Sequence, residues 1–250
     1  MTIIFLNGEY VDDNIALISH KDCGFTTGIG IFDSMLALEG KLIHAQDHYE
    51  RIIHDAKIVI GIDPSFSFED FKNTCLLLLE KNNLSTDHAR IRTTITGGKV
   101  NAPLAPATSP TVLIEAASCP PAPETPLSCI IVRDYPRVAG SIFENCKRLD
   151  YSRSYAARRR AESLGAQEAI LTNTKGNIAC GATSNLFIEE NGMLITPPLE
   201  EGVLAGITRK NLIIERKAKE QSVSFQRLQA ADNVFLTNSF IGLRKVQLIS

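Results

Sequence analysis

Lys147 is the residue of this chain whose position best suits nucleophilic chemistry. It lies in residues 145–151, with the sequence NCKRLDY, just before a helix expected over 151–164. A lysine at such a point could project into a cleft, and burial would lower the pKa of its amine enough to make it nucleophilic. Most lysines are solvated surface charges, so the position marks a candidate amine without naming a reaction.

Two further sets of residues could bind an anion. Gly206, Ile207 and Thr208 lie where a loop becomes a helix, so free backbone N–H groups and the positive end of the helix dipole face outward. Ordinary helix capping explains the same residues. Arg51 shares a helix face with His48, and it either binds an anion or is a solvated surface charge.

Composition limits the kinds of partner. The 250 residues are 44% apolar and 22% charged, as in ordinary globular proteins, and the formal net charge is −2. Such a charge gives no general attraction to nucleic acid or to an acidic membrane surface. The longest apolar runs are far too short to span a membrane, and the start lacks a signal sequence. The six cysteines lack CxxC pairs or other metal-ligand spacing, which predicts no metal site and reduced thiols in a cytoplasmic protein.

The elements that must position these residues form two groups. Four prolines within residues 120–126 exclude a helix or a central strand, so a linker is expected over 118–126. It separates a smaller N-terminal domain, 1–117, from a larger C-terminal domain, 127–250. Strand runs mixed with separate helices favour the α+β class over alternating βαβ units. The expected helices cover 47–59, 67–81, 151–164 and 206–220, and turns are expected at Asn7-Gly8 and Glu39-Gly40.

A series of short motifs resembles the fold-type IV pyridoxal-phosphate (PLP) enzymes. This family holds branched-chain aminotransferases, D-amino-acid aminotransferases and 4-amino-4-deoxychorismate lyases. Residues 22–34 resemble the family segment DRGF…GDGxFET, His48 to Arg51 match HxxR, and Lys147 to Tyr151 resemble KxLNY. Four more matches follow in the same order, at 167–171 (QEAIL), 181–187 (GATSNLF), 206–209 (GITR) and 235–239 (FLTNS). The resemblance spans the chain and implies two lobes with PLP between them, in a homodimer.

The resemblance also implies a role for each matched residue. Lys147 would form the Schiff base with PLP and carry the proton, and Tyr151 would donate a hydrogen bond to the cofactor phenolate. The cofactor phosphate would be surrounded by Arg51, by the amides of Ile207 and Thr208, and by Ser239. The other expected cofactor contacts are Cys180, Thr183 and Asn238.

One position departs from the family pattern. Where the family places a glutamate against the pyridine nitrogen, in EGxxSN, this chain has Cys180 at the start of CGATSN. A carboxylate keeps that nitrogen protonated and strengthens the ring as an electron sink, whereas a thiol holds it weakly. The substitution predicts poorer stabilisation of negative charge at the substrate, with cofactor binding retained.

The reaction is predicted from two further positions. Arg92 occupies the place of a basic residue that binds the substrate carboxylate in the family, and Gly97 stands where D-amino-acid aminotransferases have an arginine. The segment 237–246, TNSFIGLRKV, resembles the end typical of 4-amino-4-deoxychorismate lyases, in which Asn238 would contact substrate. We therefore expect a lyase that releases pyruvate and forms 4-aminobenzoate for folate synthesis. The alternatives are a branched-chain-type aminotransferase that uses 2-oxoglutarate and a catalytically weak PLP-binding protein.

Overall fold

The chain forms two compact units in a computed structural model, which describes residues 2–102 and 104–249. The first unit runs to Pro121 and also takes in Cys146–Asp150, and the second contains Ala122–Asn145 and the chain from Tyr151 onward. Each unit combines a sheet with separate helices, which confirms the α+β class. Residues 119–126, between the last strand of the first unit and the first strand of the second, form neither helix nor strand.

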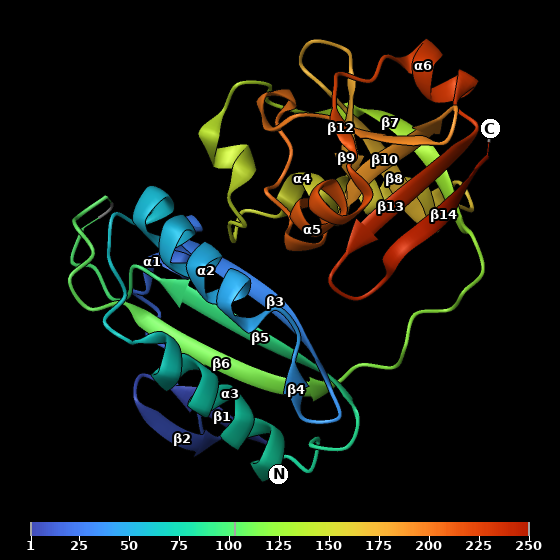
Figure 1. Ribbon diagram of the computed structural model, residues 1–250. Coiled ribbons are helices and arrows are strands. Elements are labelled where there is room, and N and C mark those ends of the chain that lie inside the picture. The colour runs from blue at the N-terminus through green and yellow to red at the C-terminus, as the bar shows by residue number, and fades with distance from the viewer. Residues whose placement is uncertain (1, 103, 250) are drawn as a thin grey trace. The chain divides into compact units, whose positions relative to one another are not determined.

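The first unit is built on a six-stranded antiparallel sheet with the order β2-β1-β6-β5-β3-β4. Figure 1 shows two long helices, α2 and α3, lying against it. The elements are β1 (Ile3–Leu6), β2 (Glu9–Asp12), α1 (Cys23–Thr27), β3 (Gly30–Leu38), β4 (Lys41–Leu42), α2 (Ala45–Val59), α3 (Phe68–Lys81), β5 (His88–Thr96) and β6 (Thr111–Ser118).

Local sequence explains how this sheet and its helices form. Asn7 and Gly8 both have positive φ, 52° and 100°, so the predicted β1–β2 hairpin is confirmed. Ser67 caps α3, and its hydroxyl and the Asp70 carboxylate form a reciprocal capping box. Apolar side chains of α2 and α3 then pack against β3, β5 and β6, with Ile52 and Leu78 almost fully buried. This core fixes α2 against β3, the two elements that carry much of the candidate site.

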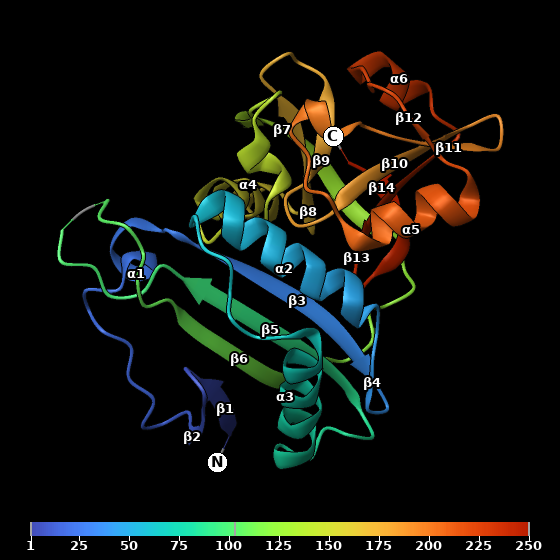
Figure 2. The same ribbon diagram turned by 60° about the vertical axis from the view of Figure 1, so that its left-hand side comes forward.

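The second unit has an eight-stranded mixed sheet with the order β12-β11-β10-β13-β14-β7-β8-β9. Figure 2 shows α4 and α5 beside its strands. The elements are β7 (Leu127–Arg137), the 3₁₀ helix η1 (Ile142–Asn145), α4 (Ser152–Ser163), β8 (Glu168–Asn173), β9 (Ile178–Gly181), β10 (Asn185–Glu190), β11 (Met193–Thr196), η2 (Leu199–Glu201), α5 (Ile207–Arg216), β12 (Lys219–Glu220), α6 (Phe225–Ala230), β13 (Asn233–Asn238) and β14 (Gly242–Leu248).

The strands of the second unit return on themselves. β9 pairs with β8 and also meets β10, where Cys180 lies opposite Asn185. Asn185 in turn lies opposite Thr237 on β13. This closure brings the ends of β9, β10 and β13 together, although β13 is far from the other two in sequence.

Two helix boundaries differ from the sequence expectation. The helix expected over 206–220 ends at Arg216, because Lys217 adopts a left-handed conformation with φ 51° and the chain continues as the short strand β12. The helix expected over 151–164 begins one residue later, because Tyr151 is the N-cap of α4. At the other end of α4, Gly165 has a φ of 79°, the left-handed conformation common just after a helix.

Candidate functional site

A buried ion network in the first unit holds Arg51. Nε and Nη2 of Arg51 contact the Oδ2 atom of Asp33, on β3, at 2.8 and 2.7 Å. Nδ1 of His48 lies 2.6 Å from the other oxygen, Oδ1. Burial acts to raise the pKa of Asp33, but Arg51 and His48 outweigh it and hold that pKa well below its ordinary value. Arg51 is thus a fixed cation, with a side chain only 10% exposed, and the solvated-charge interpretation of it is wrong.

The backbone of Lys147 is clamped from two sides. Its N–H donates to Oδ2 of Asp55 at 2.8 Å, and its carbonyl accepts from the N–H of Phe32 at 2.9 Å. Two residues later, Leu149 N–H donates to the carbonyl of Gly30 at 2.9 Å. A side chain at Gly30 would collide with Leu149, since an added Cβ would lie 2.5 Å from its Cδ1 atom. The lysine segment therefore lies along β3 within the first unit.

The Lys147 amine is surrounded by groups of both charges. Its Nζ lies 4.3 Å from the centroid of the Phe32 ring. Burial and the guanidinium of Arg51 lower the pKa of the amine to about 8, opposed by the carboxylate of Asp33. Arg92 also lowers the pKa of this amine, whereas Asp55 raises it. A lysine with this pKa has an appreciable uncharged fraction near neutral pH, as a nucleophile or base requires.

Arg92 lies next to the same aromatic ring. It is half-buried on β5 opposite Ser34, and its guanidinium carbon is 4.0 Å from the Phe32 centroid. The guanidinium is therefore stacked on a ring and is not an exposed strand charge. Phe32 links the predicted nucleophile and the predicted carboxylate-binding residue in the first unit.

In the second unit, the start of α5 presents backbone donors. Gly206 is the N-cap of α5, and its carbonyl accepts the first intrahelical hydrogen bond, from the N–H of Lys210. The amides of Ile207 and Thr208 come before that bond, so they have no acceptor within the helix. An added Cβ at Gly206 would lie 2.0 Å from Oδ1 of Asn185, so only glycine fits here. These amides suit an anion such as a phosphate.

Cys180 is paired with a cation. The guanidinium of Arg137, at the end of β7, lies beside the thiol of Cys180 and near Tyr151. Its Nη2 atom donates to Oγ of Ser154 at 2.8 Å, and Nη1 lies 3.4 Å from Oε2 of Glu144. Burial raises the pKa of the Cys180 thiol, and Arg137 only partly offsets that effect. Cys180 is therefore a neutral thiol beside a permanent cation.

The turn after β13 brings three predicted residues together. Nδ2 of Asn238 donates to the carbonyl of Thr183 at 3.3 Å, and Ser239 follows directly. Oδ1 of Asn238 accepts from the N–H groups of Phe240 and Ile241, at 2.9 and 3.1 Å. The Asn238 side chain thus organises this turn. The Thr183 hydroxyl donates to Glu168 at 2.9 Å.

Several buried polar atoms near these residues lack a partner within the described part of the chain. They are Nε of Arg137, Oγ of Ser184 and Oγ1 of Thr237. Each belongs to a residue beside or bonded to the predicted cofactor contacts Cys180, Thr183 and Asn238. An unpaired buried polar group is costly, so such a group indicates a place for a polar ligand. Together with the α5 amides of the same unit, these polar atoms fit a phosphate-bearing cofactor.

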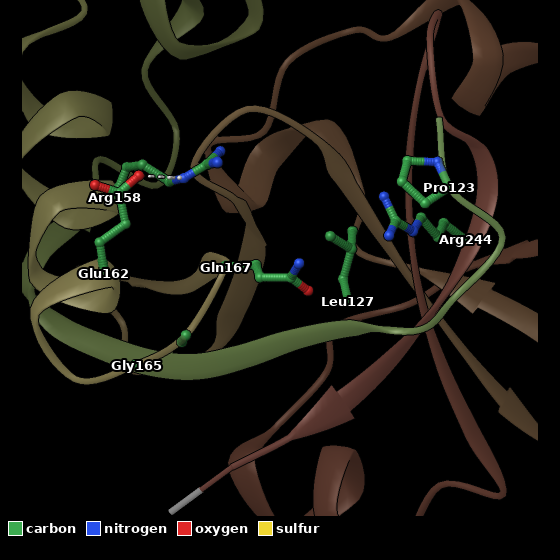
Figure 3. Close-up of a pocket in the computed structure, with 8 residues that line it drawn as sticks. Pro123, Leu127, Arg158, Glu162, Gly165, Gln167 and Arg244 are labelled. Atoms are coloured by element: carbon green, nitrogen blue, oxygen red, sulfur yellow. Dashed lines mark hydrogen bonds and ion pairs between the residues drawn. The ribbon is translucent and has the colours of Figure 1, made fainter. Parts of the chain in front are cut away.

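A separate surface depression of 530 Å³ also lies in the second unit (Figure 3). Its rim includes the ion pair between Arg158 and Glu162, whose Nε and Oε1 atoms are 3.2 Å apart. None of the predicted cofactor or substrate residues lines it. The lining residues are Pro123, Leu127, Arg158, Glu162, Gly165, Ala166, Gln167 and Arg244.

Sequence reasoning gave no role to Asp33, Phe32, Asp55 or Arg137. Asp55 follows Arg51 by four residues, and this helical spacing is a signal that could have placed it on the same face. Arg137 lies at the end of a strand outside every recognised motif, and only the structure brings it to Cys180.

Comparisons with known proteins agree with this arrangement. The family model for class IV amino-transferases matches residues 30–249. A relative from Methanocaldococcus jannaschii, provisionally named a branched-chain-amino-acid aminotransferase, is 30% identical over 94% of this chain and 84% of its own length. A D-alanine aminotransferase from Staphylococcus epidermidis is 28% identical over 96% of this chain and 86% of its own.

Solved structures include both reaction types. The branched-chain aminotransferase of Thermoproteus uzoniensis, solved with norvaline, has a TM-score of 0.91 and 26% identity, covering 99% of this chain and 87% of that one. A Legionella pneumophila protein, provisionally named 4-amino-4-deoxychorismate lyase, has a TM-score of 0.88 and 28% identity, covering 95% and 89%. Among the described residues, no helix is long and apolar enough to cross a membrane.

Proposed function

Because this chain belongs to the class IV aminotransferase family of PLP-dependent enzymes, we propose that it is a 4-amino-4-deoxychorismate lyase. Such an enzyme releases pyruvate and leaves 4-aminobenzoate, a precursor in folate synthesis. The observation that carries the proposal is the Thr237-Asn238-Ser239 turn, in which Asn238 is bonded to Thr183. The Legionella pneumophila relative supports the same assignment.

The first unit supplies the reacting amine and two cations. We assign the cofactor phosphate to Arg51, which Asp33 fixes in place, and the substrate carboxylate to Arg92. Lys147 takes the proton from the substrate α-carbon, for which an amine with a pKa of about 8 is well matched. The bond between the ring and the enolpyruvyl oxygen then breaks, the ring becomes aromatic, and the enolpyruvate that leaves takes up a proton and becomes pyruvate. PLP, when bound, supplies an electron-withdrawing ring that stabilises negative charge at the α-carbon.

The second unit supplies the remaining cofactor contacts. The amides of Ile207 and Thr208, with Ser239, are assigned to the phosphate, and Tyr151 to the cofactor phenolate. Thr183 and Asn238 are assigned to the cofactor from the turn that they share. Cys180, a neutral thiol beside Arg137, is assigned to the pyridine nitrogen.

Transamination is the second candidate, and the branched-chain relatives favour it. Lys147 would then move the proton from the α-carbon to the cofactor, with 2-oxoglutarate as amine acceptor. A D-specific enzyme is less favoured, because residue 97 is a glycine with no room for an arginine. An added Cβ there would lie 2.6 Å from Sγ of Cys23. A catalytically weak PLP-binding protein is the third candidate, and Cys180 is the observation that favours it.

One experiment separates these candidates. The purified enzyme loaded with PLP is incubated with aminodeoxychorismate, and separately with branched-chain or aromatic amino acids plus 2-oxoglutarate. Lys147→Ala is the control in each case. Formation of 4-aminobenzoate and pyruvate supports the lyase, whereas glutamate and a 2-oxo acid would reassign the enzyme as a transaminase. If no substrate gives a product at full PLP occupancy, the third candidate, a catalytically weak PLP-binding protein, is supported.

A homodimer in the cytoplasm completes the proposal. The first unit exposes several large apolar side chains, including Ile15, Leu17 and Phe25, which are 72%, 87% and 79% exposed. Contiguous exposed apolar surface marks association sites in many proteins, so these side chains are candidates for the contact between subunits. Light scattering should give twice the chain mass, and a monomer at every working concentration would contradict the dimer.

A further inference from the structure

Asp55 is a buried carboxylate beside the lysine segment. It lies on α2, one helical turn after Arg51, and is only 2% exposed. Its Oδ2 atom accepts the Lys147 N–H at 2.8 Å, and its Oδ1 atom lies 3.1 Å from Nδ1 of His54. The Sγ atom of Cys146 lies within 4.8 Å of this carboxylate. Burying a carboxylate is costly, so its retention here needs these partners.

The contacts of Asp55 act on the position of Lys147. The backbone of Lys147 is bonded to α2 through Asp55 and to β3 through the Phe32 N–H. Loss of the Asp55 acceptor would remove this hydrogen bond from a partly buried N–H group and would release one of the two sides of this clamp.

The charge of Asp55 acts on the amine. The charged groups that influence the Lys147 amine most include two cations, Arg51 and Arg92, and two carboxylates, Asp33 and Asp55. Asp33 is already bonded to Arg51 and His48, so its charge is largely compensated. Asp55 has no guanidinium among its contacts in the described part of the chain.

We propose that Asp55 is a positioning residue for Lys147, which fixes the backbone of the lysine and supplies negative charge to its amine. The proposal rests on the proposed role of Lys147 as the amine that captures PLP. Asp55 itself touches neither cofactor nor substrate in this scheme. Its effect should appear in cofactor capture, which needs no turnover.

Two substitutions separate the two effects. Asp55→Asn keeps an oxygen that can accept the Lys147 N–H, and its amide N–H₂ can face His54 and the Cys146 sulfur, but the charge is lost. Asp55→Leu removes both the charge and the acceptor. Asp22→Asn is the matched control, because Asp22 is a buried carboxylate of the same unit that bonds Gly24, Thr96 and Thr111.

The measurement is the rate at which the full chain, freed of cofactor, captures added PLP, followed by absorbance across pH. An amine must be uncharged to attack the aldehyde, so the wild-type rate should rise with a midpoint near the Lys147 pKa of about 8. Asp55→Asn should shift the midpoint down by about 1 unit, since removing a neighbouring negative charge favours the neutral amine. Asp55→Leu should also slow capture at high pH about tenfold, as expected when the backbone of the lysine loses this hydrogen bond.

The control variants distinguish a failure of the proposed function from a failure of the inference about Asp55. If Lys147→Ala captures PLP like wild type, the role of Lys147 is wrong and the proposed function fails with it. If Lys147→Ala abolishes capture but Asp55→Asn keeps the wild-type midpoint, the inference about Asp55 is overturned alone. A purely structural Asp55 would lower the melting temperature, as Asp22→Asn does, without moving the midpoint. If Asp55→Leu does not fold, the midpoint of Asp55→Asn decides the question.

Discussion

Arg51 and Asp33 form a two-point contact, with Nε and Nη2 of the guanidinium 2.8 and 2.7 Å from one carboxylate oxygen. The pair joins α2 to β3, and the same strand contacts the lysine segment through the Phe32 N–H. A guanidinium fixed in this way is prepared for a second anion, because little side-chain entropy remains to be lost on binding.

Arg51→Ala should therefore weaken PLP retention. A hydrogen bond to a charged group contributes about 1.5–3 kcal/mol, so the dissociation constant should rise by roughly 10- to 100-fold. Equilibrium dialysis of PLP against the variant and the wild type measures this. Arg90→Ala, which changes an exposed arginine on β5, is the control and should retain PLP. Equal retention by Arg51→Ala would show that the phosphate assignment is wrong.

Removal of the carboxylate should damage the fold. Asp33→Asn leaves Arg51 without its buried anion, and loss of one partner of a buried pair costs about 3–5 kcal/mol. Urea unfolding should show this loss, whereas Asp63→Asn, in an exposed pair with Lys57, should change stability by less than about 1 kcal/mol. Equal effects of the two substitutions would mean that the Asp33 network is not a stabilising feature.

The lowered pKa of Asp33 predicts that the folded protein loses stability at acidic pH. The pKa of Asp33 is lowered in the folded chain, so its contribution is present above the unfolded value of about 3.9 and is lost as pH falls further. Wild-type stability should fall below about pH 4 more steeply than that of Asp33→Asn, measured by urea unfolding across pH. Parallel curves for the two proteins would contradict this linkage.

Local signals predicted part of the fold. Asn7-Gly8 and Glu39-Gly40 turns form as expected, since both residues of each pair adopt positive φ. The end of α5 was not predicted, because Lys217 has a left-handed conformation, whereas lysine is a residue type that favours helix. The position of residues 146–150 was also outside local reasoning, because their grouping with the first unit depends on contacts with β3 and Asp55.

The candidate site shows the same division. The motifs identified Lys147, Arg51 and the α5 amides, whose chemistry follows from residue type and helix position. Arg137 could not be identified in this way, because strand closure brings it to Cys180 across more than forty residues of sequence. Asn238 was expected only as a binding residue, and the structure adds its hydrogen bonds within the β13–β14 turn.

Lys147→Ala should abolish covalent capture of PLP. Treatment of the loaded wild type with borohydride should leave the cofactor attached to a peptide containing residue 147, as read by mass spectrometry. Lys175→Ala, which changes an exposed lysine in the β8–β9 turn, is the control and should be labelled normally. Labelling of a different lysine in the wild type would reassign the reactive amine.

Cys180→Glu tests whether the thiol limits the chemistry. The thiol stays neutral and its partner Arg137 is always charged, so neither group would keep a pyridine nitrogen protonated. A new carboxylate at residue 180 would be buried, but Arg137 provides a cation within hydrogen-bonding reach of that position. The substitution should therefore leave the protein folded and strengthen the electron sink.

The rate of exchange of the substrate α-hydrogen with deuterated solvent, measured at equal PLP occupancy, reports the strength of the electron sink. Removal of this hydrogen is the step that elimination and transamination share. Cys180→Glu should raise the exchange rate at least about tenfold, which corresponds to about 1.4 kcal/mol of added transition-state stabilisation. Cys180→Ser, which adds no charge, should leave the rate near that of wild type. Unchanged or slower exchange in a folded, PLP-loaded Cys180→Glu protein would mean that Arg137 and the thiol serve a reaction that needs a weaker electron sink.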